Sequence, residues 1–281
     1  MTGPTTNRPT PSGPTSVGQA REALHEVVPR LVDLIRSIHD PDVPAIGSWT
    51  IAEVTAHVSH AVTFDRDALV GEPLPEATVT GAGMTTLNER LLRDDPVRDT
   101  RLLAERIDAL AGEFDTAVAS SDDRPVTWLG GISMAPSAVA CHLLEECLMH
   151  GHDIAAAVGR RWPIERRHAV LAVEGGVFPM ISALPPTAFV DPNKAGALRT
   201  TVELRIRGGG RTFMCLEDGE LRLRSAAVGP VDAHLSADPT ALMLTFLGRQ
   251  GIVRAISQGR LAAWGRRPWW LPRLLAATNP P

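Results

Sequence analysis

Tyrosine is absent from the 281 residues, and aromatic residues make up only 4% of the chain. No tyrosine can therefore act as a catalytic acid, base or oxyanion donor. Cysteine is also scarce, with only Cys141, Cys147 and Cys215. Three cysteines without a regular spacing argue against a disulfide framework and favour a reducing compartment.

The sequence also lacks a strong charge of one sign and a long apolar run. Its net charge is −4, which gives no basic footprint for nucleic acid. No apolar stretch reaches the ~18 residues of a membrane span. The first residues lack the basic-then-apolar pattern of a secretory signal. We therefore expect a cytoplasmic protein with no transmembrane segment and no nucleic-acid partner.

The hydrophobic pattern of the first part of the chain is helical. Residues 1–16 are rich in Pro, Thr, Gly and Ser, which predicts a disordered leader. From 17 to 184 apolar residues recur at the spacing of amphipathic helices. The expected helices cover about 17–40, 50–70, 96–120, 135–159 and 164–183, with a short one near 85–93. We predict that these helices form a helical bundle.

The pattern changes after a proline-rich stretch at 185–198, which we interpret as a linker. In the last part, 199–281, apolar and polar residues alternate as in half-buried strands. The expected strands cover 200–207, 212–217, 221–225 and 231–237, and a helix follows from Asp238. The predicted fold class is α+β, with the helical bundle followed by a smaller α+β domain that contains an antiparallel sheet.

Three residues have the types and spacing of a metal site. Glu146 and His150 lie one turn apart on one helix face, and His57 lies on the helix predicted for 50–70. Imidazole nitrogen and carboxylate oxygen are zinc ligands, and three protein ligands with an open position are typical of catalytic zinc. We therefore predict a zinc site formed by His57, Glu146 and His150.

Simpler interpretations of the same residues exist. Glu146 and His150 could form a solvated pair on a helix surface, and His57 could be a hydrogen-bonded interior histidine. The bundle could also have lost its metal. The metal is favoured because Glu146 lies in an otherwise apolar helix, where an unpaired ionised carboxylate is costly. The neighbouring Cys147 lies about 100° around the helix, so we expect it in the core.

These residues also carry a family resemblance. Trp49-Thr50 with His57, and Glu146-x-x-x-His150-x-x-Asp153, resemble the DinB-like metal-binding domain of the mycothiol-dependent maleylpyruvate isomerase family. The stretch from Leu235 through Gly248-Arg249 to Trp264-Gly265 is similar to the C-terminal domain of that family, which resembles sterol-carrier folds. The resemblance covers about 17–270.

The resemblance implies a four-helix, DinB-type bundle that holds zinc, or another divalent metal, through the three predicted ligands. It further implies that mycothiol, a low-molecular-weight thiol of actinobacteria, binds at the open position. The expected activity is thiol addition to a small electrophile, as a cis-trans isomerase or a thiol S-transferase. The alternative function is a non-catalytic, metal-containing binding or regulatory module whose C-terminal domain holds an apolar ligand.

Supporting residues are predicted around this site. His60 follows His57 by almost one turn, and we expect it to support the metal site or contact the thiol. Asp153 is likewise expected to support the metal site or contact the thiol, through a bond to backbone, ligand or another histidine rather than to His150. The resemblance also implies an arginine from the C-terminal domain that binds an acidic substrate. Candidates are Arg205, Arg249 and Arg266, and we select Arg249 as the catalytic arginine.

Overall fold

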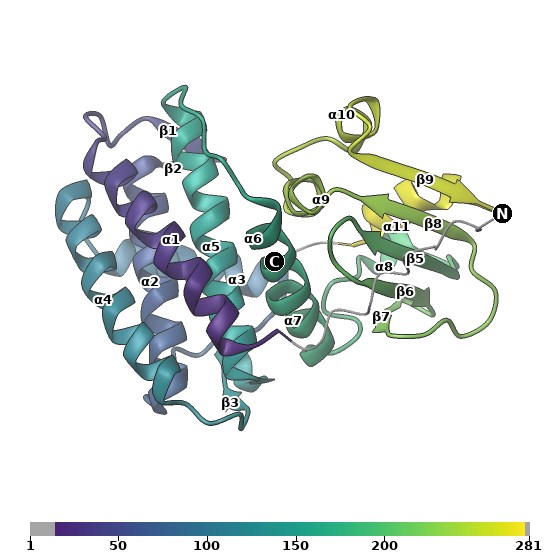
Figure 1. Ribbon diagram of the computed structural model, residues 1–281, viewed down its shortest axis with the longest axis horizontal. Helices are drawn as coiled ribbons and strands as arrows, with labels where there is room; N and C mark the ends of the chain where they lie inside the picture. The colour runs from purple at the N-terminus through teal and green to yellow at the C-terminus, as the bar shows by residue number, and fades with distance from the viewer. Residues whose placement is uncertain (1–14, 279–281) are drawn as a thin grey trace, which may run out of the picture.

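The computed structural model describes residues 15–278 (Figure 1). Residues 1–14, most of the predicted leader, lie outside the described residues. Ser16 at its end is the N-cap of α1 (Val17–Arg36), where it forms a capping box with Gln19. Within residues 15–278, no helix is long and apolar enough to cross a membrane.

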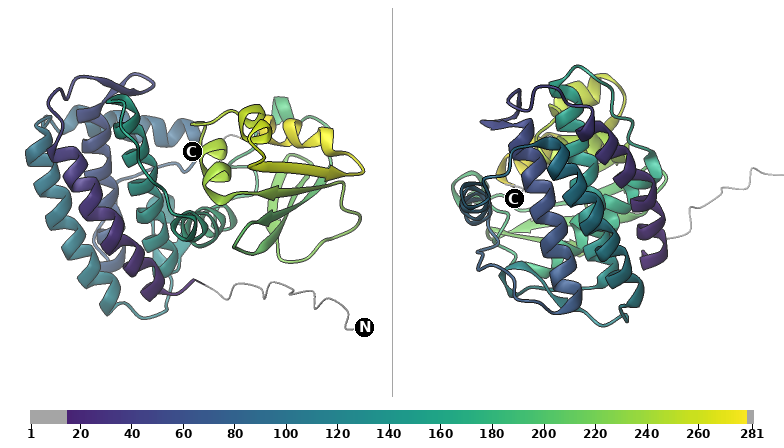
Figure 2. Two further views of the ribbon diagram at one scale, coloured as in Figure 1. Left: turned by 45° about the horizontal axis from the view of Figure 1, so that its top comes forward. Right: turned by 90° about the vertical axis from the view of Figure 1, so that its left-hand side faces the viewer.

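Four long helices form the predicted bundle: α1, α2 (Ile51–Val70), α4 (Thr100–Ser120) and α5 (Pro136–Ala157). They run side by side at one end of the molecule (Figures 1 and 2). The start of α2 is set by Thr50 and Glu53, since the Thr50 amide donates to Glu53 Oε2 at 2.8 Å and the Glu53 amide donates to Thr50 Oγ1 at 3.3 Å. A shorter helix, α3 (Gly81–Asp94), packs against α2 and begins four residues earlier than expected.

The helix predicted for 164–183 is interrupted by a π-helical segment. It consists of α6 (Arg166–Val170), the π-helical segment Leu171–Val177 and α7 (Phe178–Ala183). Two glycines let the π-helical segment approach α5 closely. A Cβ added to Gly175 would lie 2.6 Å from Cys141 Sγ, and one added to Gly176 would lie 2.9 Å from the Cys141 backbone. The pair therefore sets how closely the π-helical segment approaches α5 at Cys141, near the N-terminal end of α5.

The remaining chain contains a five-stranded sheet, with strands in the order β7-β6-β5-β8-β9. Its strands are β5 (Thr200–Ile206), β6 (Arg211–Glu217), β7 (Glu220–Arg224), β8 (Ala233–Ala237) and β9 (Leu261–Gly265). Neighbours pair antiparallel except β5 and β8, which are parallel. The α+β class is confirmed, but the sheet is not antiparallel throughout and its edge strand β9 was not predicted. Only Leu261 of β9 is buried, so this strand has no apolar alternation to detect.

Short elements complete the fold. Two small hairpins, β1 (Pro44–Ile46) with β2 (Trp49–Thr50) and β3 (Val126–Thr127) with β4 (Ser133–Met134), flank the bundle helices. Three short helices belong to the same part of the chain as the sheet: α9 (Pro239–Phe246), α10 (Ile252–Ser257) and α11 (Leu271–Ala277). The predicted linker contains α8 (Pro192–Ala195), which packs against α11. The division of the chain into two domains at 185–198 stays a prediction.

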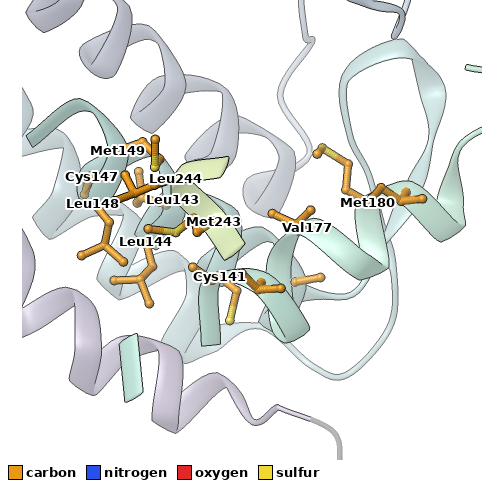
Figure 3. Packing of buried hydrophobic residues seen from close by; sticks show 14 of the residues in the cluster. Cys141, Leu143, Leu144, Cys147, Leu148, Met149, Val177, Met180, Met243 and Leu244 are labelled. Carbon is orange, nitrogen blue, oxygen red and sulfur yellow. The ribbon is translucent and has the colours of Figure 1, made fainter. Parts of the chain in front are cut away.

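The bundle and the sheet share one hydrophobic core. A single cluster of buried side chains includes Leu143 and Leu148 of α5, Met180 of α7, and Met243 and Leu244 of α9. Figure 3 shows these side chains together with others of the cluster. The helices α6 and α7 lie between the bundle and the sheet, and α6 packs against α9 (Figure 1). The end of α9 is therefore held close to α5, which carries Glu146 and His150, two of the three predicted metal ligands.

Candidate functional site

The three predicted metal ligands lie together between α2 and α5. His57 Nε2 and His150 Nε2 are each 3.2 Å from Glu146 Oε2. The two imidazole rings are 4.9 Å apart and nearly perpendicular. The ligand-type atoms of all three residues lie within 4.8 Å of one another. Two helices that are distant in the sequence thus bring two nitrogens and one oxygen to a single point.

Asp153 orients His150, which corrects our expectation that it would bond another group. Asp153 Oδ2 lies 3.1 Å from His150 Nδ1. Residues three apart share a helix face, and this short carboxylate reaches Nδ1 while Nε2 remains directed at Glu146. Asp153 also accepts hydrogen bonds from Arg249 Nε at 3.2 Å and Nη2 at 2.9 Å. Burial opposes ionisation, but the hydrogen bonds from His150 and Arg249, with the nearby His152, hold the pKa of Asp153 well below its usual value.

The charges of the three candidate ligands are set by their contacts. Burial raises the pKa of Glu146, but His150 and His57 outweigh it and hold that pKa well below 4.5. Burial lowers the pKa of His57 more than Glu146 raises it. Burial also disfavours the charged form of His150, but Asp153 and Glu146 raise its pKa to about 9. Glu146 is therefore ionised and His57 neutral, which are the states that bind metal, and a metal would displace the proton of His150.

His142 belongs to the same row of side chains and was missed in the sequence. It precedes Glu146 by four residues, as Glu146 precedes His150, so the spacing alone could have revealed it. Its Nδ1 lies 2.8 Å from Oδ2 of the fully buried Asp65, whose Oδ1 accepts a 2.7 Å bond from Trp128 Nε1. Its Nε2 lies 3.6 Å from Glu146 Oε1. Burial lowers the pKa of His142, but Asp65 and the glutamates raise it to about 10.

Glu145 was also missed, because its sequence position gives it a different helix face from Glu146. Glu145 as a whole is 8% exposed, and no hydrogen bond joins its carboxylate to another residue within 15–278. Burial, together with the charge of Glu146, raises the pKa of Glu145 to about 7. It is a buried acid without a fixed partner beside the predicted metal ligands.

A cavity of about 220 Å³ opens above these groups. Its polar side is formed by His57, His142, Glu145, Glu146 and His150. Its other walls come from α3, α7 and the end of α9, with Trp49, Trp128, Met84, Met180, Phe189, Phe246 and Arg249. The volume is below the roughly 300–1,000 Å³ of typical ligand pockets, so only a small part of a larger molecule could fit in it.

A larger hollow of about 770 Å³ lies between residues 68–77 and 126–131, but Glu72 and Glu76 are the only titratable residues that line it. It offers no histidine or cysteine that could bind a metal. We therefore place the chemistry in the smaller cavity.

The remaining predicted site residues are His60 and the three arginine candidates, which differ in whether they line the cavity. His60 bonds Asp95 at 3.1 Å and does not line the cavity, and among residues 15–278 no hydrogen bond joins it to a predicted ligand. Arg205 bonds Glu203, and Arg266 is exposed. Of the three arginine candidates, Arg249 alone lines the cavity.

The cysteines lie away from this chemistry. Cys141 and Cys147 are fully buried in the core. Burial raises the pKa of the Cys141 thiol to about 12 and that of Cys147 still higher. Cys215 lies on β6 in the sheet. None of them lines the cavity, so the chain itself supplies no thiolate there.

Comparisons with known proteins found a family model and solved structures that are similar to this chain. A family model described as "Mycothiol maleylpyruvate isomerase N-terminal domain" matches residues 20–155. A crystal structure of a histidine-to-alanine mutant of the mycothiol-dependent maleylpyruvate isomerase is similar, with 11% identity and a TM-score of 0.52, over 88% of this chain and 92% of that chain. A second crystal structure of that isomerase has 10% identity and a TM-score of 0.48 over the same shares. No curated protein sequence matches. At this identity the first structural match shows the fold.

Proposed function

Because the chain belongs, through residues 20–155, to the mycothiol maleylpyruvate isomerase family, we propose that it is an enzyme that adds a low-molecular-weight thiol to a small electrophile. The metal ligands in this proposal are His57, Glu146 and His150. The observation that carries the proposal is the convergence of their Nε2, Oε2 and Nε2 atoms beside a cavity.

The residues fit a divalent metal. The two nitrogen–oxygen separations of 3.2 Å are close to the roughly 3.4 Å between ligands of a tetrahedral site with bonds of about 2.1 Å. Asp153 holds His150 through Nδ1, as carboxylates commonly hold metal-binding histidines. The donor set of two nitrogens and one oxygen suits zinc, and the cavity leaves room for a further ligand.

A zinc ion bound there would lower the pKa of a thiol, so that the thiolate is present at neutral pH. The thiol has to come from a cofactor, because Cys141 and Cys147 are buried with raised pKa values. We propose mycothiol as this cofactor, since the matching family and the similar crystal structures are named for it.

The proposed reaction begins when the thiolate sulfur adds to one carbon of a conjugated cis double bond. The π electron pair moves onto the conjugated carbonyl as an enolate, and the former double bond can rotate. Return of that pair expels the thiolate and leaves the trans isomer. In an S-transferase the enolate takes up a proton instead, and the thioether leaves as product. Both outcomes start from the same addition.

Arg249 is positioned to bind an anionic electrophile in this reaction. Its guanidinium has five N–H groups, and three of them donate to Asp153 Oδ1, Asp153 Oδ2 and the Leu247 carbonyl. The remaining two can bind a carboxylate, and the side chain lines the cavity. Arg249 would thus orient the substrate while it supports the residue that holds His150.

Cobalt substitution tests the proposal directly. The Co²⁺-loaded protein is titrated with mycothiol, and we expect a sulfur-to-cobalt charge-transfer band that is absent with the serine-type alcohol analogue. The band should be lost in Glu146→Ala. It should remain in His60→Ala, because His60 lies on α2, as His57 does, but does not line the cavity.

Turnover is then measured with maleylpyruvate and other conjugated cis electrophiles, with and without mycothiol. Thiol-dependent isomerisation or conjugation is the expected result. Absence of the cobalt band in the loaded wild-type protein would overturn the proposed site. Thiol binding without turnover of any electrophile would instead favour the non-catalytic alternative.

A further inference from the structure

The two carboxylate oxygens of Glu146 face different histidines. Oε2 lies 3.2 Å from Nε2 of both His57 and His150. Oε1 lies 3.6 Å from Nε2 of His142, on the opposite side of the carboxylate. That distance is too long for a good hydrogen bond but close to the ligand–ligand distance in a metal site, roughly 3.4 Å. One oxygen of Glu146 is therefore not used by the first set of ligands.

His142 has the surroundings of a metal-binding histidine. Its Nδ1 is 2.8 Å from Asp65, and Asp65 is itself fixed by Trp128 at 2.7 Å. A carboxylate on one ring nitrogen leaves the other nitrogen free and oriented, as Asp153 does for His150. The two histidines of α5 are thus held in the same way, one on each side of Glu146.

Glu145 supplies a third donor at this second point. Its side chain is 8% exposed, lines the cavity, and has no hydrogen-bond partner within residues 15–278. A carboxylate oxygen of Glu145 lies within 4.8 Å of the ligand atoms of His142 and Glu146. A buried carboxylate without a partner is costly, and a cation would remove that cost.

We propose that His142, Glu145 and Glu146 form a second divalent-cation position next to the first, with Glu146 bridging the two ions. Paired metal ions in enzymes are about 3.5–4 Å apart, a distance that one carboxylate can span. The donor set of one nitrogen and two oxygens suits Zn²⁺, Mn²⁺ or Fe²⁺. The second ion would polarise the carbonyl oxygen of the electrophile while the first binds the thiol. The inference rests on the proposed function, because the two ions share Glu146 as a ligand and the second ion acts on the proposed electrophile.

A third group of ligand-type residues, Glu26, Glu165 and His168, could bind metal outside the cavity. Both of its carboxylates already accept a hydrogen bond from Arg167. Glu26 accepts from Arg167 Nη2, and Glu165 accepts from Arg167 Nε. A cation there would compete with a guanidinium. This group therefore serves as the control for peripheral metal binding.

Metal counting tests the second position. Metal-free protein is titrated with Zn²⁺ by calorimetry, and bound metal is counted after dialysis. We expect two ions per chain in the wild type and in His168→Ala, and one ion in His142→Ala, Glu145→Gln and His57→Ala. Glu145→Gln keeps the size of the side chain and leaves the Asp65–His142 pair intact, so it guards against misfolding of His142→Ala.

A spectroscopic measurement on the wild-type protein needs no variant. Two Mn²⁺ ions bridged by a carboxylate give an exchange-coupled electron paramagnetic resonance spectrum, whereas a single ion gives an isolated six-line signal. The coupled spectrum is expected for the wild type and the isolated signal for Glu145→Gln.

The outcomes separate the two proposals. One ion in the wild type that is lost in His57→Ala but kept in His142→Ala would overturn the second position and leave the proposed function standing. Two ions in the wild type but one in His168→Ala would place the additional ion outside the cavity and would also overturn it. No bound metal in the wild type would remove both proposals.

Discussion

The guanidinium of Arg249 donates to both carboxylate oxygens of Asp153, at 3.2 and 2.9 Å, although the two residues are 96 positions apart. Asp153 in turn bonds Nδ1 of His150. The segment after α9 is thus connected through one carboxylate to a predicted metal ligand on α5. A change at Arg249 should therefore reach the metal site as well as the substrate.

Arg249→Lys tests this connection. Lysine keeps the charge but cannot donate to both oxygens of Asp153, so His150 should be held less firmly. We expect the affinity for zinc, measured by competition with a chelator, to fall roughly 10–100-fold. Arg205→Lys is the matched control, because Arg205 bonds Glu203 on the sheet and does not line the cavity. Equal zinc affinity in wild type and Arg249→Lys would mean that Asp153 positions His150 without help.

The cysteines provide a test of where the reactive thiol comes from. Burial raises the pKa of Cys141 to about 12 and raises that of Cys147 further, so neither thiol ionises in the folded protein. Cys215 is only partly buried. We expect iodoacetamide to modify at most Cys215 in the native protein and all three cysteines in urea, as measured by peptide mass spectrometry. Modification of Cys147 under native conditions, with loss of activity, would instead implicate a protein thiol.

Asp238 gives the fold a stability contribution that depends on pH. Its Oδ1 accepts hydrogen bonds from the Ala241 amide at 3.0 Å and from Arg260 at 2.7 Å. Burial raises the pKa of Asp238, but these bonds outweigh it and lower the pKa below 3.8. Since the folded pKa lies below the unfolded one, the contribution is complete above the unfolded pKa of about 3.9 and is lost as the pH falls through the folded value.

Asp238→Asn isolates this contribution, because asparagine is also a good N-cap and keeps the start of α9. We expect the variant to be less stable than wild type at pH 7, and the difference in unfolding free energy to shrink below about pH 4. Urea unfolding at several pH values measures it. Asp123→Asn, which replaces an exposed carboxylate, is the control and should show no such change of the stability difference with pH. A difference that stays constant down to pH 3 would assign the effect to the cap rather than to the charge.

The sequence predicted the helices and three ligand-type residues because these features are local. Apolar spacing defines α1, α2, α4 and α5, and Thr50 with Glu53 marks the start of α2. The spacing of Glu146 and His150 places both on one face of α5, whereas the position of His57 followed from its helix and from the family resemblance. The structure brings the three together, and their role as metal ligands stays a proposal.

Other features depend on contacts between distant segments. The parallel pairing of β5 with β8 depends on the path of the chain after β7. The alternation of apolar and polar residues does not encode that path. The Asp65–His142 and Arg249–Asp153 bonds join residues 77 and 96 positions apart. The Asp153–His150 bond is local, and our expectation failed because it held that Asp153 could reach His150 only if the fold bent it back. Periodicity identifies a face of a helix but not the partner that the face will contact.

The glycines of the π-helical segment make one such long-range contact testable. A Cβ on Gly176 would lie 2.9 Å from the backbone carbon and oxygen of Cys141 and 3.0 Å from the His142 amide. These atoms belong to the backbone of α5 and cannot move aside independently. We expect Gly176→Ala to destabilise the fold by about 1–3 kcal/mol in urea unfolding, as overpacking of a core does. It should also weaken metal binding, because the displaced turn of α5 carries His142.

Gly112→Ala is the matched control, since Gly112 lies in α4 and a Cβ there would meet nothing within 4 Å. Alanine at that position should stabilise the helix by about 0.4–1 kcal/mol. The two glycine-to-alanine changes should therefore act in opposite directions. If Gly176→Ala were as harmless as Gly112→Ala, the π-helical segment would have room to retreat from α5, and the close packing would not be what fixes the position of His142.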